Sequence, residues 1–194
     1  MRSFPEAREF LSEEILGPDY PTKHLIEQAR TRGFITRGKR GRGAEPVSSR
    51  DMAALLCASL AGDTPQSATD ALEQIERMYP DFKGIGEPKG GILNFGSESC
   101  SWNFIDMIAA MIDVCRKHYD TDFEDLQMSI IRIPALYARL SWSDTPLEPE
   151  EKVFYKAGND PAPHFQGKRR SEVSFNGSVL TQVGDWLVNR TEHP

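Results

Sequence analysis

A basic, glycine-rich segment interrupts the helical patterns near the N-terminus of this chain. The segment, RGKRGRG over residues 37–43, places four cations among three glycines. Glycines in such number disfavour a helix and suit a loop or a β-hairpin. We therefore expect helices before this segment, a mobile loop or hairpin across it, and a new helix after it.

The charge of the chain is unevenly distributed. Residues 21–50 hold eight Lys or Arg and two Glu, a net charge of +6. The whole chain has a net charge of −6, so the other 164 residues carry −12. A basic region inside an acidic protein indicates that this region has a polyanionic partner.

Apolar periodicity and helix caps predict a helical N-terminal lobe, residues 1–80. The third helix begins with Ser48 or Ser49 as its N-cap and Asp51 in its first turn, and Gly62 ends it. Its apolar sequence, with Leu55 on the buried stripe, indicates a core helix. The other expected helices cover residues 6–16, 22–32 and 66–79.

A Gly- and Pro-rich stretch over residues 80–91 predicts a boundary before a second lobe, residues 92–194. In that lobe the spacing of apolar residues predicts helices and strands. The helices cover residues 102–118 and 178–189, and the strands lie within residues 127–133, 136–142, 153–156 and 171–175. The expected fold is α+β, with a winged helix-turn-helix-like lobe followed by a smaller α+β lobe.

The order of two short helices, a basic glycine-rich hairpin and another helix is typical of winged helix-turn-helix modules. Residues 24–60 resemble the N-terminal winged helix-turn-helix of MerR-type regulators. In that resemblance residues 32–35 take the helix end and turn, residues 37–42 the wing, and residues 49–51 the start of the next helix. The chain also resembles small prophage-encoded proteins of bacteria.

These patterns predict a DNA interface formed by the helix over residues 22–32 and by the wing. Lys and Arg bind phosphates by replacing condensed counterions, and Gln and Arg can read base edges. The expected DNA-binding residues are Lys23, His24, Gln28, Arg30, Arg37, Lys39, Arg40 and Arg42.

No motif in the sequence predicts catalysis, a cofactor or a metal site. Cys115 and His118 are three residues apart on a helix, but no CxxC or HExxH pattern accompanies them. Three cysteines without paired spacing are typical of a protein kept reduced in the cytoplasm, and no apolar run is long enough to span a membrane.

The sequence leaves three functions open. The first is a transcriptional regulator of phage or prophage type that binds double-stranded DNA as a homo-oligomer. The second is a DNA-packaging factor such as a phage terminase small subunit. The third is an anti-defence inhibitor that binds another protein through its acidic C-terminal lobe. The number of subunits distinguishes the first two, since a dimer favours the regulator and a large ring the packaging factor.

Overall fold

The computed structural model describes residues 2–37, 46–81, 102–118, 123, 125–133, 136–142, 151–157 and 171–188. The described chain contains six α-helices and one π-helical segment, η1. These are α1 Phe4–Phe10, η1 Leu11–Ile15, α2 Thr22–Arg32, α3 Ser49–Ala61, α4 Pro65–Ile75, α5 Phe104–Lys117 and α6 Ser178–Leu187.

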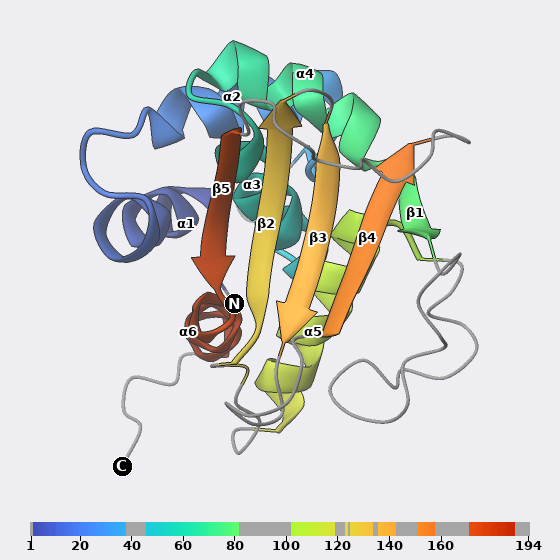
Figure 1. The fold of residues 1–194 in the computed structure, drawn as a ribbon. Coiled ribbons are helices and arrows are strands. Elements are labelled where there is room, and N and C mark those ends of the chain that lie inside the picture. The colour runs from blue at the N-terminus through green and yellow to red at the C-terminus, as the bar shows by residue number, and fades with distance from the viewer. Residues whose placement is uncertain are drawn as a thin grey trace.

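Five strands form one antiparallel sheet in the order β1-β4-β3-β2-β5 (Figure 1). The strands are β1 Met78–Asp81, β2 Gln127–Ile133, β3 Tyr137–Trp142, β4 Glu151–Ala157 and β5 Ser171–Asn176. Strand β2 lies between β3 and β5, and its Ile130 pairs with Ala138 of β3 on one side and with Val173 of β5 on the other. Because these positions point to the same face, the pairing places apolar residues together against the helices.

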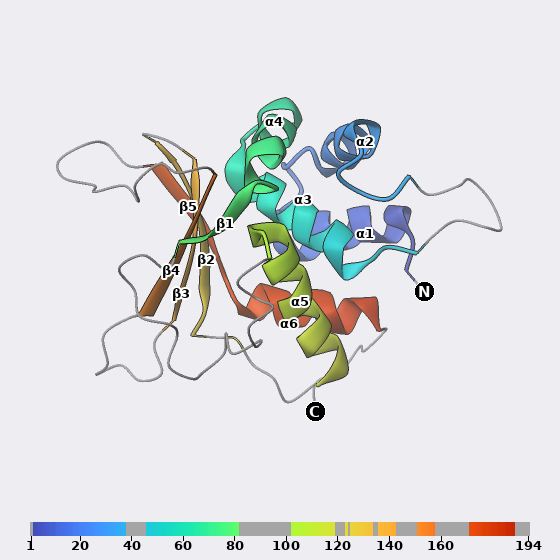
Figure 2. The ribbon, with the colours of Figure 1, turned by 90° about the vertical axis from the view of Figure 1, so that its right-hand side faces the viewer.

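The helices lie together on one side of the sheet, as Figure 2 shows. The fold is therefore α+β, as the sequence predicts, with a helical layer packed on an antiparallel sheet. The winged helix-turn-helix arrangement within the helical layer remains a prediction, because residues 38–45 lie outside the described part of the chain.

Helix α3 lies in the middle of the helical layer and is buried along its whole length except at Arg50. It contacts α4 from the N-terminal region and α5 and β2 from the C-terminal region. One hydrophobic core includes Leu55 of α3, Ile108 of α5 and Ile130 of β2. Residues on both sides of the predicted boundary thus share a core, and the boundary itself lies mainly outside the described residues.

The helix ends in the N-terminal region follow the local signals in the sequence. Helix α2 ends at Gly33, which adopts a positive φ of 84° that other residues rarely tolerate. Ser48 caps α3 and accepts a hydrogen bond from the backbone N–H of Asp51. The expected helix over residues 6–16 is present as α1 continued by η1.

The structure corrects the helix expected over residues 66–79. Helix α4 ends at Ile75, and Met78 instead begins β1, where it pairs with Ala157 of β4. Met78 is fully buried, and β1 contacts α5. Met78 is therefore buried, as the apolar periodicity implied. Its backbone is extended because it pairs with a strand that is distant in the sequence.

Candidate nucleic-acid interface

The solvent-exposed residues of α2 are Lys23, His24, Glu27, Thr31 and Arg32. His24, Glu27 and Thr31 share one face, with Lys23 at its edge. His24 Nδ1 lies 3.5 Å from Glu27 Oε2, and the two side chains are 68% and 55% exposed. Figure 2 shows α2 on the side of the helical layer away from the sheet. The face is therefore polar, with side chains that can donate or accept hydrogen bonds.

Two of the predicted DNA contacts on α2, Gln28 and Arg30, lie on its flanks. The Thr69 hydroxyl of α4 donates to Gln28 Oε1 at 3.2 Å. The Arg30 guanidinium lies over the Phe4 ring of α1, 4.5 Å from the ring centroid. Both side chains are half-buried and contact neighbouring helices, so the structure does not place them on the exposed face with His24.

Arg32 at the end of α2 forms ion pairs with Asp70 and Glu73 of α4. Hydrogen bonding to Arg32 holds the pKa of Asp70 below its ordinary value, and the Gln66 amide contributes in the same direction. Arg32 is thus a cation of the basic region that is already neutralised within the protein.

The chain leaves α2 through a turn that is anchored in the core. Phe34 donates its backbone N–H to the carbonyl of Ala29 at 2.9 Å, and the Phe34 and Ile35 side chains are buried. Exposed Arg37 folds back so that its Nη2 donates to the carbonyl of Thr31 at 3.1 Å. This contact places a cation at the carbonyl end of α2, where the helix dipole favours it.

The carboxylate of Asp51 joins the two ends of the predicted wing. Its Oδ1 accepts the backbone N–H of Thr36 at 2.7 Å, and its Oδ2 accepts the backbone N–H of Ser48 at 2.9 Å. The Thr36 and Ser48 hydroxyls donate to Oδ2 at 3.2 and 2.7 Å. We call this set, Thr36, Ser48 and Asp51, the Asp51 bridge.

A hollow of about 410 Å³ lies beside the Asp51 bridge, with Arg37 and Arg50 among its lining residues. Arg50 is half-exposed and bonds Glu76, the C-cap residue of α4, and Asp106 of α5, each at 3.1 Å. These contacts hold the start of α3 against two other helices. Arg37 is the lining cation with no acidic partner among the described residues.

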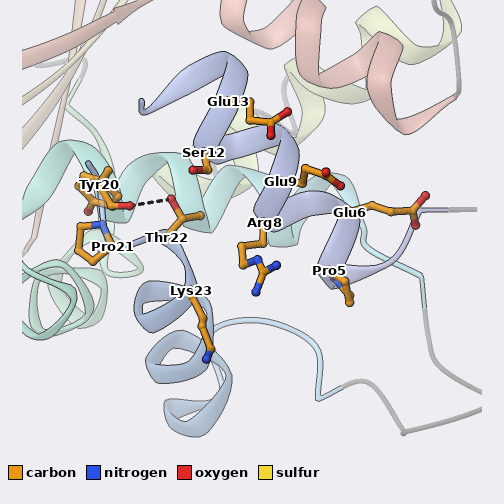
Figure 3. Close-up of a pocket in the computed structure, with 10 residues that line it drawn as sticks. All are labelled: Pro5, Glu6, Arg8, Glu9, Ser12, Glu13, Tyr20, Pro21, Thr22 and Lys23. Carbon is orange, nitrogen blue, oxygen red and sulfur yellow. Dashed lines mark hydrogen bonds between the residues drawn. The ribbon is translucent and has the colours of Figure 1, made fainter. Parts of the chain in front are cut away.

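A second hollow, of about 490 Å³, lies between α1, η1 and α2 (Figure 3). The Thr22 hydroxyl donates to the carbonyl of Tyr20 at 3.3 Å at one end of it. Acidic and basic side chains both line this groove, and the acids predominate. The charged lining residues are Glu6, Glu9, Glu13, Arg8 and Lys23. Such a lining disfavours a polyanion in this groove.

The remaining predicted contacts, Lys39, Arg40 and Arg42, lie outside the described residues. Glu27 and Thr31, which the sequence analysis did not select, share the exposed face with His24 and follow Lys23 at a spacing of four along the helix. Within the described chain no group of three or more His, Cys, Asp or Glu is placed to hold a metal ion. Nor does that part of the chain contain a helix long and apolar enough to cross a membrane.

Comparison with family models, with curated proteins and with solved structures finds no match for this chain.

Proposed function

We propose that this protein binds double-stranded DNA through the exposed face of α2 and the basic segment that follows it. One observation carries the proposal. The Asp51 carboxylate accepts hydrogen bonds from both ends of the basic segment, and this segment follows α2, whose exposed face is polar. The segment that follows α2 in the sequence holds four cations within residues 37–42, and α2 itself has exposed side chains of the types that contact bases.

The dimensions of α2 suit insertion into a major groove. The helix has eleven residues, which corresponds to about 16 Å of length at a rise of about 1.5 Å per residue. A B-DNA major groove is about 12 Å wide and accepts one helix. His24, Glu27, Thr31, Lys23 and Arg37 are exposed. We expect the first three to meet base edges and the two cations to meet phosphates.

We propose further that the protein acts as a transcriptional regulator of phage or prophage type. The buried character of α3 supports α2 as the reading helix, because α3 has only Arg50 to offer at its surface. A homodimer is the expected form, since two-fold regulators bind paired half-sites. A ring of eight or more subunits in light scattering would instead assign the protein to DNA packaging.

A mobility-shift titration against duplex DNA at two salt concentrations tests the proposal. The test variant replaces Arg37, Lys39, Arg40 and Arg42 by Ala. The control variant replaces Arg77 and Lys117, two exposed cations outside the basic region. We expect the test variant to lose affinity and to reduce the slope of log Kd against log salt by about 0.9 for each phosphate contact removed.

The control variant should retain the wild-type affinity and slope. Both variants should unfold near the wild-type urea concentration, because Arg37, Arg77 and Lys117 are exposed and the segment that holds the other three cations has no apolar side chain over residues 37–43. If the fourfold variant binds DNA as tightly and with the same salt dependence as the wild type, the basic segment is not the DNA contact.

A further inference from the structure

We propose that Asp51 is a positioning residue for the basic segment. Its carboxylate accepts hydrogen bonds from Thr36 and from Ser48, which stand on either side of residues 37–47. It thereby fixes the directions in which that segment leaves and rejoins the folded helices. The consequence for DNA affinity rests on the proposed function, whereas the mechanical role of Asp51 does not.

Helix capping explains only half of the four hydrogen bonds that the Asp51 carboxylate accepts. The bonds with Ser48 form a capping box, which satisfies free N–H groups at the start of α3. Helix α4 begins with a similar pair, Thr64 and Ser67, within its own first turn. The bonds from Thr36 reach Asp51 from 15 residues earlier in the chain and add nothing to the cap.

The surroundings of the Asp51 bridge make it rigid. Asp51 is only 3% exposed, and a buried carboxylate is stable when N–H and O–H donors surround it. Ile35 and Val47, next to the bridging residues, are buried in the core, and the Val47 N–H donates to the carbonyl of Arg2 at 3.0 Å. Both ends of the segment are therefore anchored by apolar contacts, and Asp51 links them to each other.

Preorganisation gives this arrangement a measurable effect on binding. A segment whose ends are already oriented loses less conformational freedom when it contacts a ligand, so affinity increases without any new contact. Loss of the bridge should lower the affinity for DNA about tenfold. The number of phosphate contacts would be unchanged, so the salt slope should stay the same.

Substitution of Asp51 by Asn separates this role from simple electrostatics. Asp51→Asn removes a negative charge beside the basic segment, and Coulomb interactions alone would then strengthen DNA binding. The positioning role predicts weaker binding instead. Glu9→Gln removes an exposed charge from the groove beside α2 without touching the bridge or the proposed DNA contacts. It provides the electrostatic control and should bind DNA slightly more tightly.

Thr64→Ala provides the control for loss of a cap, because it removes the corresponding N-cap of α4. This variant should be destabilised but should keep the wild-type Kd. Thr36→Val removes the hydroxyl bond to Asp51 and keeps the backbone bond. It therefore tests the same role if the Asp51→Asn protein does not fold. It should weaken DNA binding about two- to threefold.

The experiment measures Kd and its salt slope for the four variants, together with hydrogen exchange of the Thr36 amide. Weaker binding of Asp51→Asn at an unchanged slope, with faster Thr36 exchange, supports the proposal. Unchanged or tighter binding of a folded Asp51→Asn protein overturns it. If the wild type binds no DNA, the proposed function fails separately. Faster Thr36 exchange in the variant still supports the bridge, and unchanged exchange overturns it.

Discussion

Arg132 of β2 should stabilise the protein by satisfying the end of the central helix α3. Its Nε and Nη2 donate to the carbonyl of Leu60 at 2.9 and 2.6 Å, and Nη1 lies 2.6 Å from Asp63 Oδ1. Carbonyls in the last turn of a helix have no partner within the helix, so Arg132 supplies a missing donor from a distant strand. The contact joins the C-terminal region to the N-terminal one.

The structure allows the cost of Arg132→Ala to be estimated. Arg132 is only 16% exposed, whereas Asp63 is 88% exposed, so the Leu60 contact should account for nearly all of the effect. Hydrogen bonds with a charged partner contribute about 1.5–3 kcal/mol. For a protein of this size that corresponds to a decrease in Tm of about 3–12 °C.

Urea denaturation and calorimetry of Arg132→Ala and Asp63→Asn test this reasoning. Asp63→Asn should lower the free energy of unfolding by less than about 0.5 kcal/mol, because it removes only an exposed ion pair. Equal losses in the two variants would refute the assignment of the effect to Leu60. A loss below about 0.5 kcal/mol in Arg132→Ala would show that the carbonyl is equally well satisfied by water.

Three further outcomes are expected. Leu55→Ala should cost about 2–5 kcal/mol through a cavity in the shared core, seen as one cooperative unfolding transition at lower urea. Arg32→Gln should raise the pKa of Asp70 toward its ordinary value in an NMR titration. Because folding lowers that pKa, the stability that Asp70 contributes is present above the unfolded-state pKa and is lost as the pH falls through the folded-state pKa. Gln28→Ala should leave base specificity unchanged in a binding-site selection, whereas Thr31→Ala should relax it at one position, since Thr31 is exposed and the Gln28 amide faces α4.

Local signals in the sequence were sufficient to predict most helices and strands. Gly33 ends α2 and Ser48 begins α3 because their effects depend on bonds within a few residues. The strands β2 and β3 follow from short runs with alternating or continuous apolar residues. The buried character of α3 is likewise evident from its composition.

The candidate site was predicted only in part. Its region, the helix over residues 22–32 followed by a basic segment, follows from charge and glycine content. Which residues of α2 face solvent depends on where α1 and α4 pack. Arg30 therefore lies against Phe4, and Gln28 bonds Thr69. No spacing rule reveals these contacts, because the partners come from other helices.

Most of the helices and strands, and the concentration of positive charge after α2, follow from local patterns in the chain. Contacts in the folded protein are needed to see that Met78 joins a strand, that Arg32 is neutralised by α4, and that Asp51 links Thr36 to Ser48. The physical reason is the range of the interactions. Caps and periodicity act along neighbouring residues, whereas strand pairing, ion pairs and the Asp51 bridge join residues that only the folded chain brings together.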